Sequence, residues 1–162
     1  KILPDEACCL VGYPISKTLS PHGSVTRGIC SSDNNILLKI NERMEIKRNK
    51  NDEIIYIDND QITSIDENSI CSMNFWGFSS SYINILEDNF ISFLTKYGNQ
   101  LKSEWLIPEI VDYSINKNKT EFHVLSSKGD WFGVTYPEDK KRVMNLLSDL
   151  HHSGQYPKKL WN

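Results

Sequence analysis

Three short stretches carry polar residues of the kinds that bind hydroxylated, phosphorylated ligands. Gly12-Tyr13 ends an apolar run, where glycine lets a ligand approach the backbone. Asn41-Glu42-Arg43 interrupts a mainly apolar stretch. A carboxylate can accept hydrogen bonds from two sugar hydroxyls, and an arginine on the other face of the strand can reach a phosphate. Asn74 and Trp76 lie in an apolar stretch, where an asparagine needs hydrogen-bond partners.

Each of these stretches also has a purely structural interpretation. Glu42 and Arg43 fit a solvent-facing ion pair on an edge strand as well as a ligand site. Asn74 is either satisfied inside the protein or lines a pocket. His151-His152 sits at the end of a predicted helix, where a cation favours the helix dipole, so metal binding is the minor interpretation. The sequence has no Gly-rich phosphate loop and no Ser/His/Asp signature.

Composition and charge narrow the class of protein. The 162 residues, of which 39% are hydrophobic and 24% charged, predict a single globular domain over residues 1–162. A net charge of −3 argues against nucleic acid and anionic membranes as partners. The apolar runs are too short to span a bilayer. Four cysteines without a Cys-x-x-Cys spacing indicate reduced thiols, and we expect a cytoplasmic protein.

The hydrophobic pattern predicts strands first and helices later. Short apolar or alternating runs between turn signals predict strands, and helical spacing predicts three helices. The predicted strands are 7–13, 24–30, 36–48 (one long strand, or two with a bulge), a satellite hairpin within 49–65, 70–78 and 121–126. The predicted helices follow Ser79-Ser80-Ser81, begin near Ser103, and run from Pro137 to about His151. This order predicts an α/β or α+β fold with a mixed sheet and a peripheral hairpin insertion at 49–65.

Five motifs occur together in an order that resembles a known family. They are "LVGYPISKTLSPHGSVTRGIC", "INERMEI", "SMNFWGF", "SEWLIPEIV" and "WFGVTYPEDKKRV". Their order and spacing resemble the C-terminal half of sugar-phosphate nucleotidyltransferases, in particular the bacterial NDP-sugar pyrophosphorylase-like branch. The resemblance covers nearly all of the chain.

The resemblance implies a fold and a reaction. The fold would be a partial doubly wound, mixed sheet flanked by helices, with the nucleotide-binding first half of the family missing. In the reaction, a sugar 1-phosphate oxygen attacks the α-phosphorus of a nucleoside triphosphate, and pyrophosphate leaves. Mg²⁺ would be the cofactor of the longer parent protein, with cationic side chains neutralising charge. Without the first half, we expect the isolated chain to be inactive.

The same resemblance assigns roles to individual residues. Gly12 and Tyr13 would offer backbone groups to the sugar. Glu42 would hold sugar hydroxyls, and Arg43 would take the phosphate role of the family's lysine. Asn74, beside Trp76, would be another sugar contact. The segment around Glu104 matches a helix that packs beside the sugar site.

One departure from the family concerns the metal. The family pattern Trp-x-Asp-x-Gly-Thr-Pro carries a metal-binding Asp, and Gly133 stands at that position here. Asp130 is three residues away, on the opposite face of a regular strand, so we expect no metal ligand in this segment. Trp131 and Val134 would pack, and Thr135 would cap the following helix.

Two other functions remain open from the sequence. One is a non-catalytic binding or regulatory module that kept the fold. The other is a glycosyltransferase, which would carry an Asp-x-Asp metal-binding motif. Asp58-Asn59-Asp60 matches this motif but lies in the peripheral hairpin. If the first half is missing, an uncovered sheet edge predicts self-association.

Overall fold

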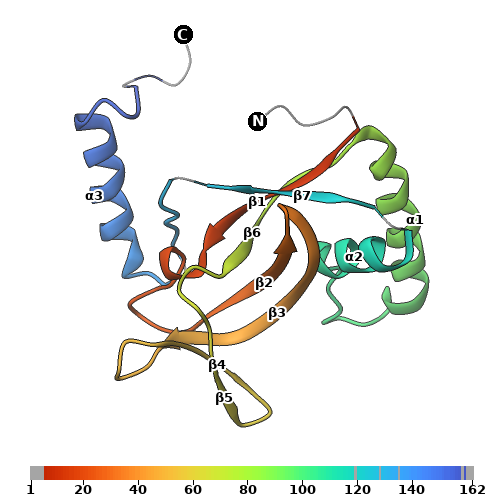
Figure 1. Ribbon diagram of the computed structural model, residues 1–162, viewed down its shortest axis with the longest axis horizontal. Coiled ribbons are helices and arrows are strands. Elements are labelled where there is room, and N and C mark those ends of the chain that lie inside the picture. The colour runs from red at the N-terminus through yellow and green to blue at the C-terminus, as the bar shows by residue number, and fades with distance from the viewer. Residues whose placement is uncertain (1–5, 119, 128, 135, 158, 160–162) are drawn as a thin grey trace.

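Five strands close into a barrel in the computed structural model, which describes residues 6–118, 120–127, 129–134, 136–157 and 159 (Figure 1). Around the ring the order is β2-β6-β1-β7-β3, and pairing between β2 and β3 closes it. Only the β1–β7 pair is parallel. The barrel strands are β1 (Cys8–Pro14), β2 (Val25–Asp33), β3 (Ile36–Arg48), β6 (Ile70–Gly77) and β7 (Phe122–Ser126).

The predicted partial doubly wound sheet is therefore wrong. A doubly wound sheet needs parallel strands joined by crossover helices, whereas four of the five barrel junctions here are antiparallel. Closure also pairs both edges of the sheet. Among the described strands, the edge left for self-association is β5 (Gln61–Ser64), which continues the sheet from β3 through β4 (Ile54–Asp58).

Tight turns set the register of the two hairpins. Asn34 and Asn35 join β2 to β3 with φ of 49° and 64°, and Asn59 and Asp60 join β4 to β5 with φ of 48° and 63°. Positive φ at both central residues is the type I′ requirement, which Asn and Asp tolerate. The predicted turns at Asp33–Asn35 and Asp58–Asp60 are confirmed, although the status of 49–65 as an insertion stays a prediction.

Strand β3 is one long strand, the first alternative that the pattern allowed, and it carries a bulge within its length. Glu45 has a φ of 52°, and the pairing with β2 shifts between Val25↔Ile46 and Arg27↔Arg43. A bulge adds one residue on one strand and increases the local twist. It allows β3 to bend around the barrel and then pair with β4 at Lys47 and Arg48.

Two apolar cores lie on the two faces of β6, as its pattern predicted. Ile70 and Trp76 pack against the first core, and Cys71 belongs to the second. The first core joins the barrel to the helices and contains Cys8, Leu10, Leu37, Tyr82, Val111, Phe122 and Val124. The second contains Ile15, Val25, Ile46, Ile54 and Cys71. All four cysteines are free thiols.

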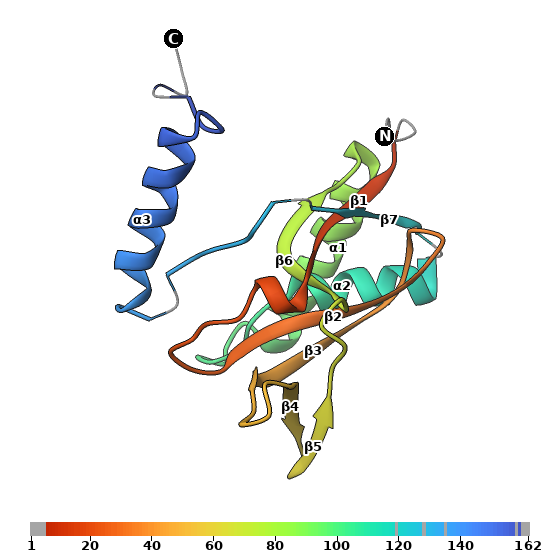
Figure 2. The ribbon, with the colours of Figure 1, turned by 60° about the vertical axis from the view of Figure 1, so that its left-hand side comes forward.

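Helices α1 (Ser80–Tyr97) and α2 (Ile107–Tyr113) lie on one side of the barrel (Figures 1 and 2). Ser79 caps α1, because its hydroxyl accepts a hydrogen bond from the Tyr82 N–H at 3.3 Å. Helix α2 begins at Ile107, later than predicted, with Pro108 in its first turn, where a missing N–H costs nothing. Its side chains lie against β3 and so border the candidate site.

Helix α3 (Asp139–His152) stands apart from the barrel on the side opposite α1 (Figure 2). It begins two residues after Pro137, so this proline is not at its first position as predicted. Among the residues of α3, only Asp139 is buried. Within the described part of the chain, no helix is long and apolar enough to cross a membrane.

Candidate ligand-binding site

A row of four residues crosses four neighbouring strands and fixes the position of Glu42. Gly12 on β1 pairs with Ser72 on β6, Ser72 pairs with Gly28 on β2, and Gly28 pairs with Glu42 on β3. Directly paired residues project to the same face of a sheet. Neighbouring strands are about 4.8 Å apart, so the row from Gly12 to Glu42 measures roughly 14 Å along the curved sheet.

Glu42 and Asn74 line one cavity at the β2–β3 end of this row. The cavity measures about 110 Å³ and is lined by Thr26, Arg27, Gly28, Glu42, Ser72, Met73, Asn74 and Pro108. A second hollow of about 180 Å³ shares Glu42 and Pro108 and is otherwise lined by Ile40, Leu106, Glu109 and Asp112. Helix α2 thus forms one wall of the site, and the Glu42 carboxylate lies where the two hollows meet.

Steric space explains the glycine at position 28, and backbone conformation explains the asparagine at position 74. A Cβ on Gly28 would fall 2.8 Å from Ile40 Cδ1 and 3.4 Å from Glu42 Oε2, so a side chain there would enter the cavity. Asn74 has a φ of 55°, which Asn tolerates better than most residues. Its backbone N–H donates to Ser72 Oγ at 3.1 Å, and its Oδ1 accepts from Trp76 Nε1 at 3.3 Å. The Asn74 amide NH₂ has no partner among the described residues.

Arg27 is the functional candidate that the sequence reasoning missed. Its Nη2 donates to the Thr18 carbonyl at 2.6 Å and its Nη1 to the Thr26 carbonyl at 2.8 Å. The guanidinium carbon lies 5.1 Å from the centroid of the Trp131 ring. Nε is buried without a hydrogen-bond partner in the described part of the chain. Its position between Val25 and Ile29, on the apolar face of β2, is the sequence signal that could have identified it.

The charges of the site influence one another. Burial raises the pKa of Glu42, Arg27 opposes this shift, and Glu109 adds to it. Burial lowers the pKa of Arg27, and the opposing effect comes from Cys71 and Glu42. Asp112 Oδ1 is buried and has no hydrogen-bond partner within the described residues. The site therefore offers one cation and several carboxylate oxygens at the barrel–α2 junction.

The other predicted site residues lie elsewhere. Gly12 is buried, its Cβ direction is blocked by Ile70, and its carbonyl accepts from Ser127 N–H at 2.9 Å. Tyr13 packs against the second core. Arg43 pairs with Asp58 at 3.0 Å and lies over the Tyr56 ring. Trp76 packs in the first core near Phe78 and Phe122, and reaches the site only through Asn74.

The segment that would carry the family's metal ligand is occupied by an aromatic ring. A Cβ on Gly133 would fall 2.7 Å from Trp131 Cη2, and Asp130 pairs with Lys17 at 2.7 Å. Val134 is exposed rather than packed, and the predicted cap Thr135 lies outside the described residues. Among the described residues, no three His, Cys, Asp or Glu side chains gather to hold a metal ion. At this position Gly133 and the Trp131 ring do not fit the metal-binding carboxylate of the family pattern.

Comparison with known proteins leaves the family open. No protein-family model matches the chain, and no curated protein matches it. The functional interpretation therefore depends on the geometry of the site and on the resemblance of its motifs.

Proposed function

We propose that this chain is the sugar-phosphate-binding part of a cytoplasmic nucleotidyltransferase. The parent reaction would transfer a nucleotidyl group from a nucleoside triphosphate to a sugar 1-phosphate, with release of pyrophosphate. The chain itself would bind the sugar phosphate without catalysing the transfer. No step assigned to its residues depends on Mg²⁺.

One observation carries the proposal: Glu42, Asn74 and Arg27, from three different strands, line the same cavity. A carboxylate accepts hydrogen bonds from neighbouring sugar hydroxyls, and an amide NH₂ donates to a ring or hydroxyl oxygen. A guanidinium with a free N–H donates to a phosphate oxygen. These are the three kinds of contact that a sugar phosphate requires.

The roles differ from those that the resemblance implied. The phosphate role passes from Arg43 to Arg27, because the Arg43 guanidinium is engaged by Asp58 and Tyr56. Of the five N–H donors of Arg27, the Thr18 and Thr26 carbonyls take two, so Nη1 and Nη2 each keep a donor for a ligand beside the buried, unpartnered Nε. Since the cavity is small, the phosphate group would sit within it and the sugar ring would extend along Glu42 toward the hollow beside α2.

Binding calorimetry with a panel of sugar 1-phosphates tests the proposal. We expect one of the glucose, mannose, galactose or N-acetylglucosamine 1-phosphates to bind, and Glu42→Gln to weaken it about tenfold, as the loss of a charge-assisted hydrogen bond implies. Glu45→Gln is the matched control, because Glu45 is, like Glu42, an exposed carboxylate of the same strand, and it lies outside the cavity. If none of these sugar 1-phosphates binds, the proposal is refuted.

A non-catalytic binding module is the second candidate function. The observation that favours it is the Trp131 ring beside Gly133, at the place where the family carries a metal-binding carboxylate. Both candidates bind a sugar phosphate, and they differ in chemistry. Pyrophosphate release by a longer form of the protein, given a nucleoside triphosphate and the same panel, supports the nucleotidyltransferase. Binding without release supports the module.

A further inference from the structure

A cavity of about 600 Å³, here called the α3 cavity, lies between α3 and the segment at 129–132. Its volume is within the range of roughly 300–1,000 Å³ that small-molecule sites occupy. Six of its lining side chains are apolar or aromatic: Leu19, Trp131, Phe132, Leu146, Leu150 and Tyr156. The cavity therefore suits a ligand with an apolar body.

The aromatic walls of the α3 cavity are held by contacts to their neighbours. The Trp131 ring centroid lies 5.1 Å from the guanidinium carbon of Arg27 on the barrel. Beyond α3 the chain turns back at Gly154, where φ is 75°, and the Tyr156 N–H donates to the Leu150 carbonyl at 3.0 Å. These contacts form the two ends of the aromatic wall before any ligand arrives.

Two charged side chains of the lining have no partner. Lys17 and Asp130 pair with each other at 2.7 Å. Arg142 and Asp149 have no ion pair or side-chain hydrogen bond within the described residues. Residues seven apart share a helix face and are separated by roughly 10.5 Å along the axis. The cavity thus carries an unpaired cation toward one end of the helix face and an unpaired anion toward the other.

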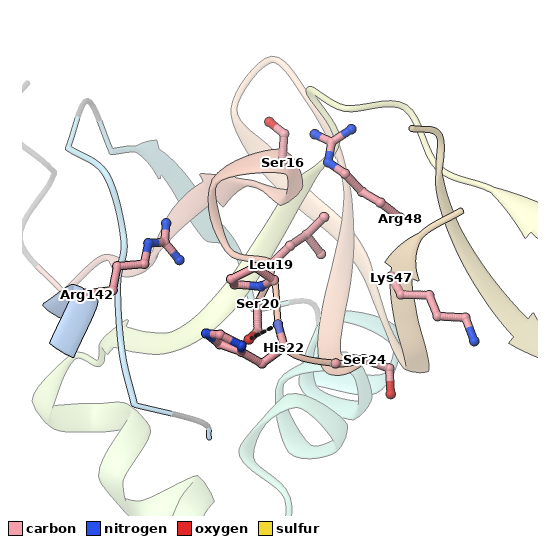
Figure 3. Close-up of a pocket in the computed structure, with 10 residues that line it drawn as sticks. Ser16, Leu19, Ser20, His22, Ser24, Lys47, Arg48 and Arg142 are labelled. Atoms are coloured by element: carbon pink, nitrogen blue, oxygen red, sulfur yellow. Dashed lines mark hydrogen bonds between the residues drawn. The ribbon is translucent and has the colours of Figure 1, made fainter. Parts of the chain in front are cut away.

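Arg142 stands where the α3 cavity meets a neighbouring cavity of about 630 Å³ (Figure 3). The two cavities share Ser16, Leu19 and Arg142. In Figure 3 the Arg142 side chain extends from α3 toward the barrel segment that carries Ser16 and Leu19. Its guanidinium therefore lies at the end of the α3 cavity that faces the barrel.

The two unpaired charges are reversed relative to the dipole of α3. The start of a helix favours negative charge and its end favours positive charge. Arg142 is nevertheless the fourth residue of α3, and Asp149 is the fourth from its end. A ligand with a carboxylate beside Arg142 and an ammonium beside Asp149 would complement both the side chains and the dipole. This arrangement favours a zwitterion over a ligand with one charge.

We propose that the α3 cavity binds a short apolar peptide of about three residues with free termini, its carboxylate at Arg142 and its ammonium at Asp149. An extended chain spans at most about 3.3–3.6 Å per residue, so three residues match the separation of the two charges. The Gln155 side chain also lines the cavity and has no hydrogen-bond partner among the described residues. Its amide carries donors and an acceptor, which match the C=O and N–H of a peptide bond.

The peptide proposal is independent of the sugar-phosphate proposal. The α3 cavity and the Glu42 cavity share no lining residue. Either proposal can therefore fail without the other.

Isothermal titration of the chain with trileucine at low ionic strength tests the peptide proposal. Dileucine is too short to reach both charges and triserine lacks apolar side chains, so both should bind more weakly. N-acetyl-trileucine and trileucine amide each lack one terminal charge, and each should bind about tenfold more weakly than trileucine. Added salt should weaken the binding of trileucine, because exposed charges are screened.

Matched substitutions assign each terminus of the peptide. Arg142→Gln should weaken trileucine binding about tenfold but leave the affinity for trileucine amide unchanged, because that peptide has no carboxylate to lose. Asp149→Asn should weaken trileucine equally and leave N-acetyl-trileucine unchanged. Lys141→Gln and Glu138→Gln are the controls, since they remove the same charges from exposed positions outside the cavity.

The proposal is overturned if trileucine does not bind, if triserine binds as tightly, or if the control substitutions weaken binding as much as Arg142→Gln and Asp149→Asn. If N-acetyl-trileucine binds as tightly as trileucine, the ligand is an apolar carboxylate and the peptide assignment is wrong. Arg142 and Asp149 are both exposed, so their substitution removes no core contact. Circular dichroism of each variant checks that it folds.

Discussion

The Trp131 indole lies directly over Gly133, so that a Cβ on residue 133 would fall 2.7 Å from Cη2 of the ring. The same ring lies 5.1 Å from the Arg27 guanidinium carbon. Glycine at 133 therefore lets an aromatic ring cover the arginine of the candidate site. A side chain at position 133 would have to displace this ring.

Gly133→Asp tests this packing. The side chain would displace the Trp131 ring and weaken its contact with Arg27, and we expect the free energy of unfolding to fall by about 1–3 kcal/mol. Urea denaturation measures the loss. Gly129→Ala is the control, since its Cβ would meet only Ser127 Oγ at 3.7 Å. Equal stability of Gly133→Asp and the wild type would contradict the packing account, and tighter Mg²⁺ binding would support the family alignment.

The pKa of Glu42 gives the protein a pH-dependent stability of predictable sign. Burial raises this pKa above its ordinary value of 4.5, so the folded state holds the proton more tightly than the unfolded state. The free energy of unfolding should therefore fall as pH rises from the ordinary pKa through the raised one. Glu42→Gln should remove this decrease in the free energy of unfolding. Urea denaturation of the wild type and the variant from acidic to neutral pH measures it.

Glu6 serves as a control, because its contribution to the free energy of unfolding changes with pH in the opposite direction. Its carboxylate accepts from the Ser80 and Ser81 hydroxyls at 3.0 Å, and these hydrogen bonds lower its pKa. Its contribution to stability is present above the ordinary pKa and is lost as pH falls. If the Glu42→Gln and wild-type stabilities run parallel over the whole pH range, the partial desolvation that raises the pKa of Glu42 is wrong.

Local structure was largely predictable from the sequence, whereas closure of the barrel was not. The turns at Asn34-Asn35 and Asn59-Asp60 and the Ser79 cap depend on a few neighbouring residues with known backbone preferences. Closure depends on pairing between strands far apart in the chain. The β2–β6 junction has only two paired positions, Gly28↔Ser72 and Ile29↔Cys71, and no local pattern marks them.

The candidate site was predictable only in part, for the same reason. Glu42 and Asn74 were each singled out from the sequence as sugar contacts; they line one cavity, and their role stays a prediction. Gly12 was selected because glycine permits close approach, but the group that approaches it is the Ile70 side chain. Arg27 was missed because its neighbours Thr18 and Trp131 come from distant segments that the sequence alone does not bring together.

A buried hydroxyl pair ties α1 to the end of α2 and so supports the wall of the site. Tyr82 and Ser114 are hydrogen-bonded at 2.8 Å and both are fully buried. Tyr82→Phe leaves the Ser114 hydroxyl without its partner, and we expect a loss of about 1–2 kcal/mol in the free energy of unfolding. Thermal and urea denaturation measure it.

The double variant Tyr82→Phe/Ser114→Ala isolates the interaction between the two side chains. Because it removes both partners, its loss should be smaller than the sum of the two single losses. Strict additivity would show that the two hydroxyls do not interact.

Self-association through an exposed sheet edge stays a prediction, and β5 is the strand on which to test it. Ile62 is 69% exposed on this strand. If β5 strands pair between molecules, Ile62→Lys should reduce concentration-dependent association in light scattering, because charge on an edge strand opposes pairing. Leu101→Lys is the control, since this exposed residue lies outside every strand. A wild-type protein that is monomeric at high concentration refutes the prediction.

The most direct test of the central claim is amide chemical-shift mapping by NMR as the bound sugar 1-phosphate is added to the chain. We predict the largest shifts at Arg27, Gly28, Glu42, Ser72 and Asn74, and their loss in Glu42→Gln but not in Glu45→Gln. Shifts confined to residues that do not line this cavity, or no shifts at all, would contradict the assignment of the Glu42 cavity as the sugar-phosphate site.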